Sequence, residues 1–238
     1  MAAKVWGIIV SDVVGSSRTQ DVRSVLGAKL RIATIAHLEE KRIRLPYAVT
    51  AGDEFQTVAS ELHQIPGLLF DLRRRMRPLQ LRVGIGIGLI SGQLRPPVNQ
   101  LGGQAFQFAR VAIEEAKEGR AHSEKLTRFH SENERFDLVT NLIYSLHDAL
   151  VGTLSEKQWE TVDAYLAKGR VYLAAGALKI NASTASRNLR RSHFWQSLET
   201  MDVMKKIIES SFPKLHASVQ KAASDGSGVV LTVQMRRN

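Results

Sequence analysis

The fold is decided by the stretch Leu81-Arg82-Val83-Gly84-Ile85-Gly86-Ile87-Gly88, in which aliphatic residues alternate with arginine or glycine. An alternation with period two is typical of a β-strand, and it predicts a strand over residues 79–90. The glycines fall on one face of this strand. They leave room for something to approach the backbone closely, either a packed helix or a ligand.

The segments around this strand predict a sheet with helices. The apolar run Val5–Val10 is a buried-strand pattern that ends at Asp12, and strand candidates at 47–50 and 55–58 flank a tight turn at Gly52. Apolar residues at three- and four-residue spacing predict helices over 22–38, 62–76 and 104–117. This order predicts an α+β fold: a sheet of the ferredoxin-like or palm kind, covered by helices on one face.

The C-terminal part of the chain has a helical pattern. Residues 136–154 predict a helix that bridges two domains, 155–194 a helix-turn-helix, and 201–223 a long amphipathic helix. An alternating segment at 229–235 predicts a short strand before Arg236-Arg237. We therefore expect an α/β domain over 1–125, a connecting helix over 126–154, and an all-α helix-turn-helix DNA-binding domain with a C-terminal helix and short strand over 155–238.

The composition restricts the classes of function. The 238 residues carry a formal net charge of +10 and include no cysteine. The charge favours a polyanionic partner, and the lack of cysteine excludes disulfides, thiolate zinc sites and thiol nucleophiles. No apolar run approaches the ~20 residues of a membrane span, and Asp12 interrupts the N-terminal apolar run before any signal-peptide pattern. We expect a cytoplasmic protein that does not enter membranes.

Acidic residues follow the first strand and the predicted hairpin turn. Asp12 and Asp53 converge if these two strands are neighbours, and Glu54 is a third candidate oxygen ligand. Such carboxylates suit Mg²⁺ or Mn²⁺ bound together with a nucleotide, and Gly15-Ser16-Ser17 would offer backbone N–H groups to a phosphate. The alternative is that each aspartate only forms a turn or caps a helix.

The segment 178–191 predicts the turn and recognition helix of a helix-turn-helix. Thr184, Arg187 and Arg191 lie at positions i, i+3 and i+7, so they share one outward stripe, which Ser183 and Arg190 border. Such a stripe suits double-stranded DNA, because polar side chains reach base edges while arginines contact phosphates. The alternative is a solvated basic helix, or a helix-turn-helix that contacts another protein.

Four motifs in the first half resemble the catalytic domain of class III nucleotide cyclases. In chain order they are Ile8-Ile9-Val10-Ser11-Asp12-Val13-Val14-Gly15-Ser16-Ser17-Arg18, Thr50-Ala51-Gly52-Asp53-Glu54-Phe55, Arg82-Val83-Gly84-Ile85-Gly86-Ile87-Gly88 and Gly103-Gln104-Ala105-Phe106-Gln107-Phe108-Ala109-Arg110. Over its whole length the chain is more similar to the bacterial SatD family, which joins such a region to a helix-turn-helix. The resemblance implies that Asp12 and Asp53 hold metal ions and that Arg110 contacts the nucleotide and stabilises a transition state.

Two positions depart from the cyclase pattern. Val49 stands where cyclases usually carry a base-selecting lysine, and Phe106 stands where they carry a ribose-orienting asparagine. Retained acids without these substrate contacts favour a degenerate domain that senses a metal or nucleotide or forms a dimer. We therefore expect a homodimeric DNA-binding transcription regulator rather than an enzyme. The first alternative is a metal-dependent nucleotidyl cyclase or transferase that uses Asp12, Asp53 and Arg110, and the second is an interaction protein without a small ligand.

Overall fold

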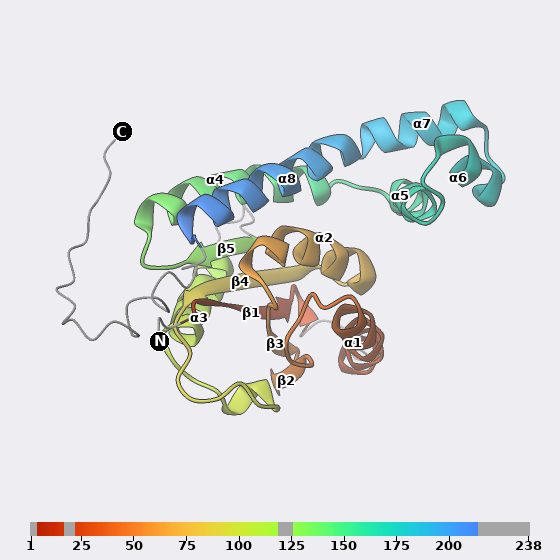
Figure 1. Ribbon diagram of the computed structural model, residues 1–238. Helices are drawn as coiled ribbons and strands as arrows, with labels where there is room; N and C mark the ends of the chain where they lie inside the picture. Colours follow the sequence, from red (N-terminus) through yellow and green to blue (C-terminus); the bar gives the residue numbers. More distant parts are fainter. Residues whose placement is uncertain (1–3, 17–21, 119–125, 214–238) are drawn as a thin grey trace, which may run out of the picture.

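The structure is a computed structural model that describes residues 4–16, 22–118 and 126–213 (Figure 1). Within these residues the fold is mixed α+β, with a five-stranded sheet and eight α-helices. The strands are β1 (Trp6–Val13), β2 (Ala48–Ala51), β3 (Glu54–Val58), β4 (Leu81–Gly88) and β5 (Thr127–His130). The helices are α1 (Val22–Glu39), α2 (Ile65–Met76), α3 (Gln104–Lys117), α4 (Glu134–Val151), α5 (Glu156–Lys168), α6 (Val171–Leu178), α7 (Ala182–Arg191) and α8 (Phe194–Ser211).

The strand order in the sheet is β2-β3-β1-β4-β5. Strand β1 is central and pairs antiparallel with β3 on one side and β4 on the other, whereas β5 pairs parallel with β4. The hairpin of β2 and β3 turns at Gly52, whose φ of +62° is the left-handed conformation that glycine adopts readily. The turn therefore brings Asp53 to the end of the sheet at which strand β1 finishes.

The two faces of β4 pack against different layers. The aliphatic side chains Val83 and Ile85 point into the main core, which the helices α1, α2, α4 and α8 complete. The glycine face lies against α3, since a Cβ at Gly84 would come within 2.4 Å of the Ile113 nitrogen and one at Gly86 within 2.1 Å of the Ala105 oxygen. A packed helix therefore fills the space beside the glycines, and the helices cover both faces of the sheet rather than one.

Helices α5, α6 and α7 form a lobe that projects from the sheet (Figure 1), and we call it the head. Its small core includes Trp159, Val162, Leu189 and Phe194. Helix α8 leaves the head and runs back across α2 and α4 (Figure 1). We call the sheet with α1 to α4 and α8 the body, because the apolar side of α8 belongs to its main core.

The C-terminal organisation differs from the sequence-based prediction in two respects. The segment 126–154, predicted as a connecting helix, contains strand β5 as well as α4, and both pack in the body. The segment 155–238 is divided between head and body, because Met204 and Ile208 of α8 are buried in the main core. The end of the helix predicted over 201–223, the strand predicted at 229–235 and Arg236-Arg237 lie outside the described residues. None of the helices described has the length and apolar character needed to cross a bilayer.

Candidate functional site

The outward face of α7 carries the side chains that the sequence predicted to contact DNA. Ser183, Arg187, Arg190 and Arg191 are exposed, and Thr184 is half-buried. The inward positions Ala185 and Leu189 are buried, as their spacing predicted. The helix therefore presents a polar, basic face away from the core of the head.

The connection between α6 and α7 is a short turn built from three residues. Lys179 adopts a left-handed conformation with φ +54°, and Asn181 occupies the N-cap position of α7. Asn188 of α7 donates a hydrogen bond to Thr161 of α5 at 3.0 Å, which joins the first and third helices of the head. These contacts fix the orientation of α7 relative to α5 and α6.

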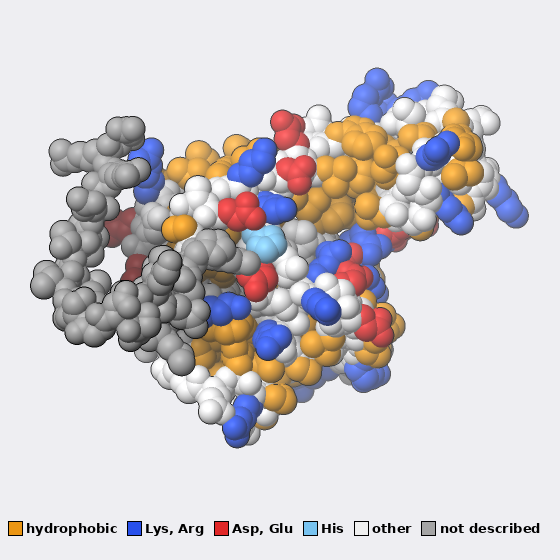
Figure 2. Space-filling view, viewed as in Figure 1, with side chains coloured by type: hydrophobic (Ala, Val, Ile, Leu, Met, Phe, Trp, Pro, Cys, Tyr) orange, Lys and Arg blue, Asp and Glu red, His pale blue; other side chains and the backbone are white. Residues whose placement is uncertain are grey.

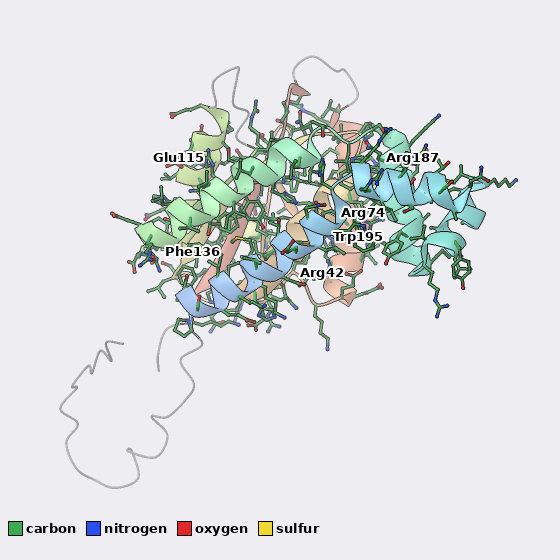
Figure 3. The ribbon with its side chains drawn as sticks, turned by 90° about the horizontal axis from the view of Figure 1, so that it is seen from above. Arg42, Arg74, Glu115, Phe136, Arg187 and Trp195 are labelled. Atoms are coloured by element: carbon green, nitrogen blue, oxygen red, sulfur yellow. The ribbon has the colours of Figure 1, made fainter. Side chains whose placement is uncertain are left out.

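After Asp163, the charged side chains of the head are all basic. The sequence contains no acidic residue between Asp163 and Glu199, whereas six lysines and arginines lie in that interval. No ion pair involves Arg187, Arg190 or Arg191 within the described part of the chain. Blue lysine and arginine side chains are spread around the far end of the head in Figure 2, and Figure 3 shows Arg187 on α7. This surface can neutralise an anion without first breaking an internal contact.

The second candidate site lies where β1 meets the turn between β2 and β3. The backbone N–H of Val13 donates to Asp53 Oδ2 at 3.0 Å, so the turn is attached to the end of β1. Asp12, at the end of the same strand, is 8% exposed, and its Oδ1 has no hydrogen-bond partner. The two aspartates therefore lie at the same end of the sheet, and Glu54 follows at the start of β3.

Cationic side chains surround these acids. The Lys117 Nζ lies 3.7 Å from Asp12 Oδ2 and 3.6 Å from Glu54 Oε2, between the two carboxylates. Arg110 donates two hydrogen bonds to Glu54, at 2.8 and 2.9 Å, in a bidentate arrangement. The Arg82 guanidinium lies 3.6 Å from Asp12 Oδ1. Lys117 also donates a hydrogen bond to Glu114 at 3.0 Å, so acids and cations of the protein already pair with one another here.

The pKa values of the two buried acids shift in opposite directions. Burial raises the pKa of Asp12, and the charges of Asp53 and Glu54 add to this, while Arg82 and Lys117 counteract it. Burial also acts to raise the pKa of Glu54, but the hydrogen bonds from Arg110 and Thr50 outweigh burial and lower it. Glu54 is thus the ionised acceptor of the arginine, whereas Asp12 is held less firmly in its charged form.

The predicted metal and phosphate ligands gain little support from this arrangement. Within the described residues no group of three or more His, Asp or Glu side chains is placed to hold a metal ion. The Lys117 ammonium stands between Asp12 and Glu54, where a divalent ion shared by them would have to sit. Gly15 forms a turn with φ +70°, Ser16 follows it, and Ser17 lies outside the described residues. The metal site and the phosphate loop stay predictions, and these side chains do not fit a bound metal as they stand.

Sequence reasoning did not assign a role to Lys117. Arg110 and Lys117 are seven residues apart on α3, two turns along the same face of the helix. This spacing could have identified Lys117 from the sequence, because a lysine two helical turns from the predicted site arginine lies on the same face of the helix and can reach the same acids.

Comparisons with known proteins place the chain in a family. The model of the SatD family matches residues 6–208, which is most of the chain. The chain belongs to the SatD family. No curated protein matches this SatD-family chain. Among solved structures it is similar to a regulator of polyketide synthase expression from Bifidobacterium adolescentis, at 12% identity over 87% of this chain and 86% of that one, with a TM-score of 0.29. A TM-score this low does not establish a shared fold.

A further set of functional contacts in the SatD-family protein joins body and head. Arginines at the end of α2 pair with acids of α4 and α5, and Arg73 pairs with Asp148 of α4. Arg74 pairs with Asp163 at 2.8 Å, and Arg77 pairs with the same carboxylate at 2.5 Å. Cations at a helix C-terminus are also locally favourable. The structure places these arginines in ion pairs that fasten α5 to α2.

Proposed function

We propose that this SatD-family protein is a DNA-binding regulator that contacts duplex DNA through α7. The observation that carries the proposal is that Arg187, Arg190 and Arg191 are exposed and make no ion pair among the described residues. Every arginine in the last turns of α2, by contrast, has an acidic partner. Free guanidinium groups on one helix face suit phosphates and the O6 and N7 atoms of guanine.

The geometry of the head supports this use of α7. A short turn separates α6 from α7, and the buried Ala185 and Leu189 hold α7 against the other two helices. The head projects away from the sheet (Figure 1), an arrangement that favours access to α7 from outside. A helix-turn-helix of this kind places the N-terminal residues of its last helix, here Ser183 and Thr184, near base edges.

The sheet body is proposed as a regulatory module rather than as an active site. Its acids are paired with Arg110 and Lys117, so neither the arginine nor the carboxylates are free to act on a nucleotide as they stand. The residues Val49 and Phe106 remove two substrate contacts of the cyclase pattern. We propose that this module sets the position or pairing of the heads in a homodimer, because one recognition helix reads too few base pairs for strong selectivity.

The proposal is tested by fluorescence-anisotropy titration of a labelled duplex with the full chain over a series of salt concentrations. The test variant is Arg187→Ala with Arg191→Ala. We expect its affinity to fall about tenfold to a hundredfold, and the slope of log K against log salt to become shallower by about 2, since each phosphate contact contributes roughly 0.9. Circular dichroism checks that the variant is folded.

A matched control separates a local effect from a general loss of charge. Arg31 and Arg44 are exposed on the body and form no ion pair within the described residues, so Arg31→Ala with Arg44→Ala removes the same charge elsewhere. We expect this control to bind DNA nearly as the natural chain does. Equal losses in both variants, or no loss in either, would contradict the assignment of α7.

A further inference from the structure

Helix α4 presents an apolar outer face to solvent. Leu138 is 74% exposed, Leu142 and Leu146 are each 63% exposed, and Val139 beside them is 41% exposed. The leucines are four residues apart, so they form one stripe along the helix. In Figure 3, which is seen from above, α4 and α8 lie on top, and no other described element covers them. The stripe is therefore an apolar surface of the kind that marks a protein contact.

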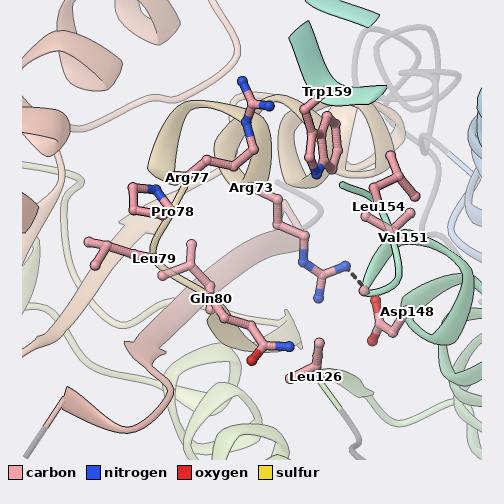
Figure 4. A pocket seen from close by; sticks show the side chains of 12 residues that line it. Arg73, Arg77, Pro78, Leu79, Gln80, Leu126, Asp148, Val151, Leu154 and Trp159 are labelled. Carbon is pink, nitrogen blue, oxygen red and sulfur yellow. Dashed lines mark hydrogen bonds and ion pairs between the residues drawn. The ribbon is translucent and has the colours of Figure 1, made fainter. Parts of the chain in front are cut away.

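The charged residues of α4 do not interrupt this stripe. After Arg135, the only acids, lysines or arginines of the helix are Asp137 and Asp148, and both are buried. Asp137 accepts hydrogen bonds from Ser131, and Asp148 pairs with Arg73 at the wall of the cavity in Figure 4. Both acids are used inside the body. The outer face is left without charge, whereas a surface helix usually turns charged and polar residues outward.

The spacing of the stripe is symmetric about Leu142. If α4 packs antiparallel against α4 of a second copy with Leu142 on the twofold axis, Leu138 of each copy faces Leu146 of the other. A twofold interface has to be self-complementary in this way, because both partners use the same surface. The pattern of the stripe therefore fits a second copy of this chain.

Arg135 extends the same face at the start of α4. It lies two helical turns before Leu142, is exposed, and forms no ion pair with any described residue. In the antiparallel arrangement this arginine reaches the last turn of α4 in the other copy, a turn that carries no basic residue. A cation is favourable there, because the C-terminus of a helix has a partial negative charge.

Acidic side chains of α8 lie beside that same end of α4. Val151 of α4 and Met201 of α8 pack against one small cluster. Glu199 and Asp202, on either side of Met201, are exposed and form no ion pair among the described residues. Two antiparallel copies therefore bring Arg135 of each near acids of the other, so the apolar stripe and the charges favour the same arrangement.

We propose that this SatD-family protein forms a homodimer in which α4 of one copy packs antiparallel on α4 of the other. The proposal rests on the homodimer of the proposed function and names its surface. Because the chain passes from α4 into the head, the two heads lie beyond opposite ends of the paired helices (Figure 1). The 18 residues of α4 span about 27 Å, so the arrangement keeps the two α7 helices apart, as separate half-sites on one duplex require.

Helix α1 also exposes apolar side chains, and it provides the matched control. Ile32 is 64% exposed and Ile35 is 59% exposed. Arg31 is exposed directly beside Ile32, so antiparallel pairing of α1 through this face would bring together arginines of the two copies, which repel. Ile32 therefore matches Leu142 in size, exposure and helical setting, but not in its suitability for a twofold contact.

The test measures the mass of the full chain by analytical ultracentrifugation, without DNA and at micromolar concentration. We expect the natural chain to be a dimer. Leu142→Glu places two carboxylates across the twofold axis, and we expect the dissociation constant to rise at least about thirtyfold, as for an interface hot spot. Ile32→Glu should leave the dimer unchanged, and circular dichroism checks that both variants are folded.

A charge-swap variant tests the antiparallel register. Leu138→Glu alone should weaken the dimer. Leu138→Glu with Leu146→Lys should recover much of that loss, because each introduced glutamate then faces an introduced lysine of the other copy. In a parallel pairing like charges would face each other, and the double variant would dissociate further. That result would overturn the antiparallel arrangement.

A single thiol identifies what covers the stripe. The chain has no cysteine, so Leu142→Cys introduces the only thiol. Oxidised glutathione should link two chains of this variant on a non-reducing gel, whereas Ile32→Cys should give no link. The proposal is overturned if the natural chain is a monomer or if folded Leu142→Glu stays dimeric. A monomer whose Leu142→Cys thiol resists a maleimide would also overturn it, and would indicate that residues 214–238 cover the stripe.

These outcomes stay distinct from the test of DNA binding. The mass measurement contains no DNA, and Arg187 and Arg191 are unchanged in every variant of α4. A dimer through α4 that binds no duplex would contradict only the assignment of α7. A monomer that binds a duplex through Arg187 and Arg191 would contradict only the α4 surface and the homodimer.

Discussion

Two arginine clusters in this SatD-family protein have similar composition but differ in whether their arginines have acidic partners; Figure 3 labels one residue of each, Arg74 and Arg187. At the end of α2, each arginine pairs with an acidic side chain. These acids lie in α2 itself, in α4 or in α5, and Glu40, directly after α1, is a further partner. In the cluster on α7, Arg187, Arg190 and Arg191 point into solvent and have no acidic partner in the described residues. The first cluster holds the molecule together, and the second is available to bind something else.

The comparison teaches that a basic run has no fixed role of its own. Both clusters lie near helix C-termini, where cations are locally favourable. What separates them is the position of the acids in the folded chain, since Asp148 and Asp163 come 75 and 89 residues after their arginine partners. Substitutions in and around each cluster therefore test this difference.

Arg73→Ala should have the largest effect. The change leaves Asp148, whose side chain is 1% exposed, without its cation, and removing one partner of a buried ion pair costs about 3–5 kcal/mol of unfolding free energy. Urea denaturation followed by circular dichroism measures this. Replacing both partners, Arg73→Met with Asp148→Leu, should recover much of the loss because no buried charge is left unpaired. A loss below about 1 kcal/mol in Arg73→Ala would show that the α2 cluster is not structural.

The local features of this fold could be predicted from the sequence. The alternation at 81–88 identified β4, the helical spacing identified α3 with the observed bounds 104–117, and the glycine-led turn identified the β2–β3 hairpin. The position of α7 and its buried residues Ala185 and Leu189 also followed from local spacing. Each of these depends on residues close together in the chain, where periodicity and turn chemistry decide the conformation.

The remaining features depend on partners distant in sequence. Strand β5 has only four residues, Thr127–His130, too few to show a period. The return of α8 onto the body follows from Met204 and Ile208 meeting α2 and α4, which an amphipathic pattern alone does not specify. Lys117 was missed at the acidic cluster because the sequence suggested a metal as the counter-charge. Its position between two carboxylates shows how a lysine can supply that charge instead.

Asp71→Asn should have the next largest effect, and the effect should depend on pH. Burial acts to raise the pKa of Asp71, but hydrogen bonds from His37, Arg75 and Arg74 outweigh it and hold the pKa far below its ordinary value. A carboxyl with a lowered pKa in the folded state stabilises the protein above its unfolded pKa of about 3.9 and loses this contribution as the pH falls below it. We expect a loss of about 1.5–3 kcal/mol at pH 7 that shrinks progressively below about pH 4.

Urea denaturation at several pH values measures the Asp71 effect. Asp202→Asn is the matched control, because Asp202 is exposed on α8 and makes no ion pair among the described residues. We expect the stability of this control to follow that of the natural chain at every pH. A deficit in Asp71→Asn that stays constant down to pH 3 would contradict ionisation of Asp71 as its source.

Lys179→Gly should stabilise the head slightly. Lys179 adopts φ +54° in the turn before α7, a conformation that costs a non-glycine residue about 1–2 kcal/mol. Glycine removes this strain, but it also raises the entropy of the unfolded chain, which lowers the stability by roughly 0.5–1 kcal/mol. The net gain is about 0.5–1 kcal/mol, or roughly 2 °C in melting temperature for a chain of this size. Lys168→Gly is the control within helix α5, where glycine should destabilise by up to about 1 kcal/mol. A lower melting temperature for Lys179→Gly would mean that a contact of the lysine side chain stabilises the head by more than the backbone strain destabilises it.

Arg187→Ala should have the smallest effect on stability. The side chain is exposed and unpaired among the described residues, and substitutions at such positions change the unfolding free energy by no more than about 0.5 kcal/mol. Measured beside Arg73→Ala in the same urea titration, this variant compares one arginine of each cluster directly. If Arg187→Ala destabilised the protein by more than about 1 kcal/mol, the guanidinium would be holding the head together, and the free charge on which the proposed DNA binding depends would be absent. If stability is unchanged while duplex binding falls, the α7 arginines contribute to recognition and the α2 arginines to the fold.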